Sequence, residues 1–105
     1  MNKFGITEKS LKIIIQTLST FSVIERAVIF GSRAKGNYKK GSDIDIAIYG
    51  SHLSESTALN LNAKLNEEQP IPYFIDVVSP LFLENASLRE HIDRVGIEFY
   101  CKKAN

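Results

Sequence analysis

The sequence predicts an α+β fold, in which a small mixed sheet of about four strands is flanked by about four helices in layers. Short apolar runs of strand length alternate along the chain with longer segments whose apolar residues recur at helical spacing. Glycine, proline and serine residues stand between these segments, where turns are expected. No long Pro- or Gly-rich linker divides the 105 residues, so we expect residues 1–105 to form a single domain.

Two long helices are predicted from their caps and apolar stripes. The first follows Thr7, a favourable N-cap residue, and runs to about Ser19. The other follows Ser54 and runs to about Glu68, before the helix-breaking Pro70. The residues that recur at helical spacing and should face the core are Leu11, Ile14, Ile15 and Leu18 in the first helix and Ala58, Leu61 and Leu65 in the other.

Two shorter helices complete the helical part of the prediction. Residues 33–39 favour a short helix, although Gly36 weakens it. Ser87 and Glu90 have the spacing of a capping box, which predicts that the last helix starts at Ser87. Gly96 is a suitable stop for that helix.

Four strands are predicted, at residues 25–30, 44–49, 73–78 and 97–101, because these runs are short and apolar or alternating. The third run contains Asp76 between apolar neighbours, and a carboxylate there is costly to bury unless it is paired or bound to a metal. The residues of the second run that should face the core are Ile44, Ile46 and Ile48.

The stretch between the first two strands carries the strongest chemical signal. Gly31 and Ser32 end an apolar strand, and such a turn can present backbone N–H groups to a phosphate. A helix that starts just after Ser32 would add its partial positive charge, and Arg33 could neutralise phosphate charge. Asp43 and Asp45 are two residues apart at the start of the next strand, so they share one face of it.

A Mg²⁺ site is predicted where these carboxylates meet Asp76. If the second and third strands are neighbours, Asp43, Asp45 and Asp76 converge at one edge of the sheet, and a divalent cation would relieve their repulsion. Such a cluster can hold two Mg²⁺ ions, one for a nucleoside triphosphate and one for an attacking hydroxyl. Asp76 could also accept the proton of that hydroxyl.

Other interpretations of these residues are less well supported or remain open. A Walker A loop needs Lys-Ser/Thr after its second glycine, and an EF-hand loop needs a glycine soon after its Asp-x-Asp pair; neither is present. Taken alone, Gly31-Ser32 would be interpreted as an ordinary turn. Asp43 could instead be a turn or cap residue, and Asp76 could be a structural carboxylate. His52 and His91 have no partners at metal-ligand spacing, and we interpret both as surface residues.

Composition places the protein in the cytoplasm. The formal net charge is +1, which gives no overall attraction to nucleic acid or membrane. A single cysteine cannot form an internal disulfide, which fits a reducing compartment. No apolar run approaches the ~20 residues of a membrane span, and the N-terminal residues lack the apolar core of a signal peptide.

The motifs taken together resemble a known family. Gly31-Ser32, ten residues, and Asp43-Ile44-Asp45, with a third aspartate on a later strand, are similar to the nucleotidyltransferases of the DNA polymerase β superfamily. The stretches GSRAKGNY, SDIDIAI and SLREHIDRVGIEFY, and the small size, resemble its minimal branch, the MNT domains.

This resemblance implies a function and a set of site residues. The metal-binding and catalytic carboxylates would be Asp43, Asp45 and Asp76, and the phosphate-binding residues Gly31, Ser32 and Arg33. The family implies Mg²⁺ and a nucleoside triphosphate, with ATP expected. Many minimal members resemble antitoxins that silence a HEPN-domain toxin by adding AMP to a tyrosine, which implies a hetero-oligomer. No segment of this sequence resembles the extra domains with which larger family members bind DNA or RNA, so we expect no direct nucleic-acid binding.

Three functional hypotheses follow. The first is a Mg²⁺-dependent protein adenylyltransferase that acts on a partner toxin. The second is a non-catalytic antitoxin that only binds nucleotide and toxin. The third, less favoured because no acceptor domain is recognisable, is a small-molecule nucleotidyltransferase.

Overall fold

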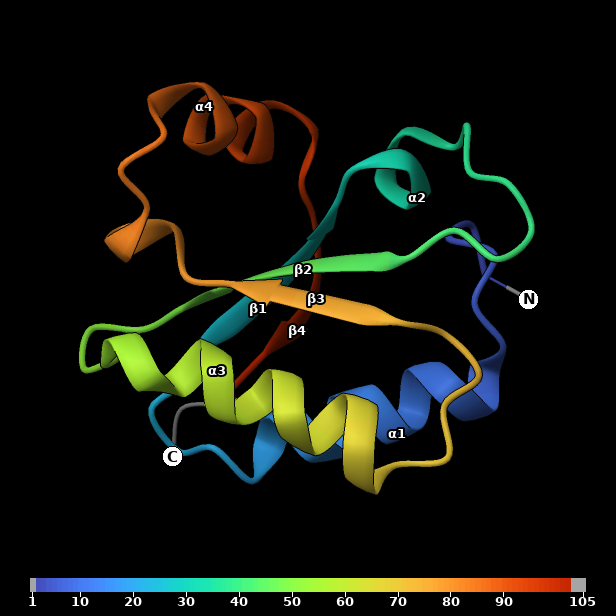
Figure 1. Cartoon of the computed structure of the whole chain (residues 1–105), viewed down its shortest axis with the longest axis horizontal. Helices are drawn as coiled ribbons and strands as arrows, with labels where there is room; N and C mark the ends of the chain where they lie inside the picture. The colour runs from blue at the N-terminus through green and yellow to red at the C-terminus, as the bar shows by residue number, and fades with distance from the viewer. Residues whose placement is uncertain (1, 103–105) are drawn as a thin grey trace.

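The elements are arranged in layers around a four-stranded mixed sheet, as seen in the computed structural model, which describes residues 2–102 (Figure 1). Helices α1 and α3 cover one face of the sheet, while α2 and α4 lie on the other side of it. The elements in chain order are α1 (Glu8–Ser19), β1 (Arg26–Phe30), α2 (Ser32–Lys35), β2 (Ile44–Tyr49), α3 (Glu55–Ala63), the π-helical segment η1 (Lys64–Glu68), β3 (Ile75–Val78), the 3-10 turn η2 (Pro80–Phe82), α4 (Ala86–Val95) and β4 (Ile97–Cys101). This architecture confirms the predicted fold class.

The strand order in the sheet is β3-β2-β1-β4. Strand β1 is antiparallel to both β2 and β4, whereas β2 and β3 are parallel and are connected through α3. Strand β3 therefore lies at one edge of the sheet, directly beside β2, which carries Asp45 and begins one residue after Asp43. Because β2 and β3 are parallel, both strands begin at the same end of the sheet.

The alternation of side chains divides the core into two parts. Ile44, Ile46 and Ile48 are fully buried on the face that packs against α1 and α3, as predicted. Ala47 points to the opposite face, where it joins a smaller cluster of Val28, Phe30 and Ile92 from α4. The odd-numbered positions of β2 thus belong to the α4 side, and the carboxylate of Asp45 lies on this side.

Local capping explains where the first and third helices start. The hydroxyl of Thr7 accepts a hydrogen bond from the Ser10 backbone N–H, which confirms the predicted N-cap of α1. Ser54 and Thr57 form a capping box at the start of α3. The helical conformation reaches Glu68 as predicted, but the last five residues form a π-helix.

Several predicted boundaries are wrong, among them the starts of β1 and α2, which are each displaced by one residue. Helix α4 starts at Ala86 because the side chain of Asn85, not Ser87, accepts a bond from the Leu88 N–H. Helix α2 ends at Lys35, well before residue 39, because the next residue, a glycine with φ of 85°, closes it in the left-handed conformation. Strand β3 starts at residue 75 instead of 73.

Among residues 2–102, no helix is long and apolar enough to cross a membrane.

Candidate functional site

The turn after β1 has a backbone conformation that only glycine adopts readily. Gly31 has φ of 73° and ψ of −153°, and it leads directly into the four-residue helix α2. The carbonyls of Gly31 and Ser32 accept hydrogen bonds from Lys35 and Gly36 at 3.1 and 2.9 Å. These two bonds close the short helix α2 directly after the end of β1.

Gly31 also lies against the carboxylate of Asp45. A Cβ atom at position 31 would overlap Oδ2 of Asp45, because Phe30 and Asp45 are cross-strand partners in the β1–β2 pair. The absence of a side chain at Gly31 thus leaves the room in which the carboxylate lies. The structure brings the predicted phosphate turn and the predicted acidic residue together at one point.

The second acidic contact comes from the edge strand. Asp45 and Asp76 are paired in register in the parallel β2–β3 ladder, so their side chains leave the same face of the sheet side by side. Asp45 is half-buried, while Asp43 and Asp76 are exposed. Burial, followed by the negative charges of Asp76 and Asp43, raises the pKa of Asp45 from 3.8 to about 6.

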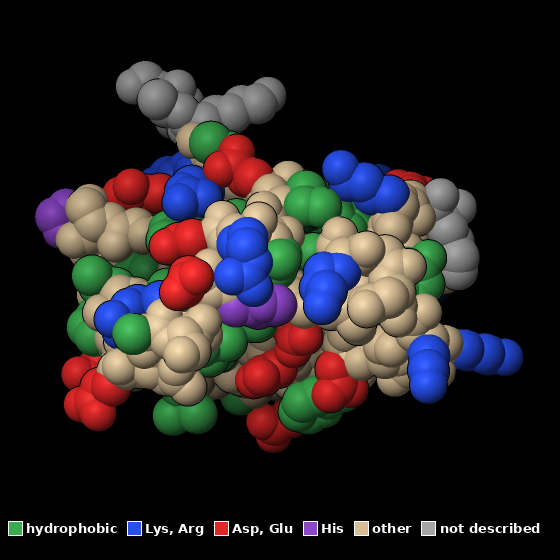
Figure 2. Space-filling view, turned by 90° about the horizontal axis from the view of Figure 1, so that it is seen from above, with side chains coloured by type: hydrophobic (Ala, Val, Ile, Leu, Met, Phe, Trp, Pro, Cys, Tyr) green, Lys and Arg blue, Asp and Glu red, His purple; other side chains and the backbone are tan. Residues whose placement is uncertain are grey.

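This electrostatic situation fits a bound cation. Burial and the negative charges of Asp76 and Asp43 all raise the pKa of Asp45, so a cation between these carboxylates would reduce their repulsion. Carboxylate oxygens are also the ligands that Mg²⁺ prefers. Across residues 2–102, no three His, Cys, Asp or Glu side chains are arranged closely enough to hold a metal ion as they stand. Figure 2, which views the molecule from the side of α2 and α4, shows several acidic side chains on this face, with Lys and Arg side chains among them.

Arg33 occupies a different position from the one expected of a phosphate ligand. Its guanidinium is buried and donates hydrogen bonds to the carbonyls of Ser42 (2.7 and 3.1 Å), Phe4 (2.9 Å) and Gly5 (3.2 Å). The ring of Tyr38 lies 5.1 Å from the guanidinium carbon and that of Tyr73 lies 4.9 Å from it. These contacts tie the loop before β2 to the N-terminal segment. The role of Arg33 toward phosphate stays a prediction, and this geometry favours a structural role.

A groove runs along the outer side of Asp76. It has a volume of about 400 Å³, and its lining includes Leu59, Phe74 and Asp76. Leu59 and Phe74 are 70% and 60% exposed, which is unusual for large apolar side chains. An extended apolar surface therefore borders the acidic site.

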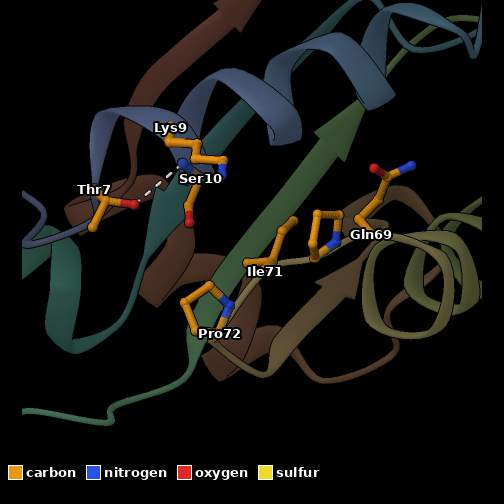
Figure 3. Close-up of a pocket in the computed structure, with 7 residues that line it drawn as sticks. Thr7, Lys9, Ser10, Gln69, Ile71 and Pro72 are labelled. Carbon is orange, nitrogen blue, oxygen red and sulfur yellow. Dashed lines mark hydrogen bonds between the residues drawn. The ribbon is translucent and has the colours of Figure 1, made fainter.

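Two other hollows lie away from the carboxylates. One, of about 440 Å³, is lined by Arg33, Tyr38, Tyr73 and the lysines at 39 and 40. The other lies between the first turn of α1 and the segment that precedes β3, where Thr7 and Ser10 face Ile71 and Pro72 (Figure 3). Neither includes an aspartate of the motif.

The sequence interpretation missed two asparagines at the β3 edge and the partial burial of a histidine beside β1. Asn62 and Asn66 bond to the backbone of β3 on both sides of Asp76, and His91, which we interpreted as a surface residue, is half-buried with its ring edge against Phe30. The asparagines are four residues apart on a predicted helix, so they share one face of it. The four-residue spacing of the asparagines is the sequence feature that could have revealed them. It has a meaning only once β3 is known to lie beside this face of the helix.

Comparison with known proteins decides the family. A family described as "Polymerase beta, Nucleotidyltransferase" matches residues 12–105, which is most of the chain. The chain belongs to this family. The nucleotidyltransferase assignment made from the motif spacing is thereby confirmed. A search of curated proteins found no significant match.

Solved structures share the nucleotidyltransferase fold. A toxin–antitoxin structure with AMP-PNP is 19% identical with a TM-score of 0.69, and the match covers 93% of this chain and 76% of that one. The MntA-HepT toxin–antitoxin structure is 20% identical with a TM-score of 0.65, covering 88% and 70%. A structure named as a candidate nucleotidyltransferase from Sulfolobus solfataricus is 23% identical with a TM-score of 0.59, covering 90% and 79%. These likenesses support the fold.

Proposed function

We propose that this nucleotidyltransferase-family chain is a Mg²⁺-dependent enzyme that transfers AMP from ATP to a hydroxyl group, that of a tyrosine of a partner HEPN-type toxin. The observation that carries the proposal is the in-register pair Asp45 and Asp76 directly beside the Gly31 turn. Triphosphate chemistry needs a phosphate-binding turn and carboxylates for metal at the same place. Family membership supports the reaction class.

Each residue of the site has a proposed role. The N–H groups at Gly31 and Ser32 would bind the β- and γ-phosphates of ATP. Asp43, Asp45 and Asp76 would hold Mg²⁺, which supplies neutralisation of phosphate charge and a lowered pKa of the attacking hydroxyl. The acceptor oxygen forms a bond to the α-phosphorus, and the bond from that phosphorus to the pyrophosphate oxygen breaks. Asp76 is the exposed carboxylate that would accept the hydroxyl proton.

The acceptor would approach from the groove beside Asp76. Strand β2 lies on one side of Asp76, and the groove with Leu59 and Phe74 lies on the other. A protein segment can cover these exposed apolar side chains, whereas a small polar acceptor gains little from them. The likeness to toxin–antitoxin structures supports a toxin as the partner, in a cytoplasmic hetero-oligomer.

A non-catalytic antitoxin is the second candidate. Four large apolar side chains, Leu59, Phe74, Leu81 and Phe82, are exposed, which suits a binding module as well as an enzyme. In that case the carboxylates would bind nucleotide without transferring it.

Intact-mass spectrometry of the partner toxin, incubated with this chain, ATP and Mg²⁺, separates the two candidates. We expect a mass gain of one or more AMP units on the toxin, and no gain with the Asp43→Asn, Asp45→Asn double variant. Asp93→Asn, an exposed aspartate on α4, is the matched control and should retain transfer. A stable complex that shows no mass gain with any of the four common triphosphates would support the binding module instead.

A further inference from the structure

Two asparagines complete the exposed edge of the sheet. Asn66 Oδ1 accepts a hydrogen bond from the Ile75 N–H at 2.9 Å, and its Nδ2 donates to the Ile75 carbonyl at 2.7 Å. Asn62 does the same for Val77, at 2.8 and 3.1 Å. Each side-chain amide thus offers β3 one acceptor and one donor, as a residue of a neighbouring strand would.

The spacing of helix and strand makes this double contact possible. Four helical residues rise about 6 Å, and two strand residues span ~6.6 Å, so Asn62 and Asn66 match Ile75 and Val77. Asn66 lies in the π-helical segment η1, and its Nδ2 also donates to the Asn62 carbonyl at 2.9 Å. Both Asn66 amide hydrogens are therefore used, and the side chain is held in one orientation.

Asp76 is the residue between the two contacts. Its neighbours in sequence are held from outside by Asn62 and Asn66, while the inner side of β3 pairs with β2 in the register that sets Asp45 beside Asp76. An edge strand normally has one free side and frays more easily than a central one. Here that side is fixed at the two positions that flank the carboxylate.

We propose that Asn62 and Asn66 are positioning residues, which hold the edge strand so that Asp76 stays beside Asp45 in the geometry that nucleotidyl transfer requires. The proposal rests on the function proposed above. Neither asparagine contacts the reacting atoms; each acts through the β3 backbone. The simpler alternative is that the two amides only shield the edge from pairing with other chains.

Leucine substitutions test the proposal because leucine has a similar volume and no polar atoms. We compare Asn62→Leu and Asn66→Leu with Asn60→Leu, an exposed position on the same helix. We expect the Val77 amide in Asn62→Leu and the Ile75 amide in Asn66→Leu to exchange with solvent at least about tenfold faster by NMR, because each loses its acceptor. We expect kcat for transfer to fall roughly 10- to 100-fold while KM for ATP changes less than about twofold, because a small misplacement of a reacting group acts on the chemical step. Asn60→Leu should behave as the wild type.

Wild-type kcat in variants with fast-exchanging amides would overturn the proposal and leave edge shielding as the role of the asparagines. If a leucine variant does not fold, Asn62→Gln and Asn66→Gln replace it; they keep the donor and the acceptor but displace the amide by one methylene, so their effects should be intermediate.

The positioning role of the asparagines can be tested separately even if the proposed transferase function is wrong. If the wild-type chain transfers no nucleotide, the NMR signals of Asp76 decide the question of position. Shifts of its backbone resonances in the Asn62 and Asn66 variants, without shifts in Asn60→Leu, would support positional control of Asp76. Unchanged Asp76 resonances would overturn it.

Discussion

The missing side chain of Gly31 makes room for the carboxylate of Asp45. The two residues come from adjacent strands, and a Cβ atom at Gly31 would overlap Asp45 Oδ2. The same glycine has φ of 73° and ψ of −153°, a region in which other residues are strained. Position 31 is therefore restricted to glycine by its own backbone and by the acidic residue beside it.

Gly31→Ala should destabilise the protein more than Gly36→Ala. Both glycines have positive φ, but a Cβ at Gly36 would meet nothing within 4 Å, so that variant carries backbone strain alone, about 1 kcal/mol. Gly31→Ala adds the clash with Asp45, for which we expect a total loss of roughly 3 kcal/mol. Chemical denaturation of the two variants measures the difference, and equal losses would mean that Asp45 yields without cost.

The stability of the metal-free protein should fall as the pH rises from about 4 to about 6. The pKa of Asp45 is raised from 3.8 to about 6 in the folded state, so in this range the folded protein binds more protons than the unfolded chain. The free energy of unfolding then decreases with pH until Asp45 is fully ionised. Asp45→Asn should flatten the curve between these pH values, measured by denaturation in the presence of a chelator. A slope that survives this substitution would assign the effect to another group.

Mg²⁺ should stabilise the protein at pH 7.5 and much less at pH 5. At pH 5 Asp45 is largely protonated, because its pKa is about 6, and a protonated carboxyl is a poor metal ligand. A ligand at about ten times its Kd stabilises by ~1.4 kcal/mol, which corresponds to a Tm rise of about 6–11 °C. Thermal melts with and without Mg²⁺ check this, and chelation should reverse the rise. Asp43→Asn should lose the response and Asp93→Asn should keep it; a rise of equal size at both pH values would contradict a site that contains Asp45.

Arg33 should matter for folding more than for nucleotide binding. Arg33→Met removes four hydrogen bonds to carbonyls in a buried place, and we expect it to cost about 3 kcal/mol, whereas the exposed Lys35→Met should stay within ~0.5 kcal/mol of the wild type. The affinity of folded Arg33→Lys for ATP, measured by calorimetry, should change less than about threefold. A loss above tenfold, ~1.4 kcal/mol, would return Arg33 to the role of phosphate ligand that the family resemblance implies.

The local patterns of the chain were sufficient for most elements. The period of Leu11, Ile14 and Leu18 predicts α1 because apolar residues on one helical face need a partner layer. The alternation in 44–49 predicts β2 with its correct bounds and its buried isoleucines. Boundaries that were wrong, such as those at residues 39, 73 and 87, depend on which of several competent caps or turns the folded chain uses.

The sequence alone determined which residues are candidates for the chemistry, because Gly31, Ser32 and the three aspartates stand out by type and spacing along the chain. Only the tertiary structure decided how they meet. The β2–β3 register places Asp45 beside Asp76. The guanidinium of Arg33 donates hydrogen bonds to backbone carbonyls, and two asparagines bond to the β3 edge. These relationships join residues up to 31 positions apart. Strand pairing and burial set them, and neither is encoded in a local pattern.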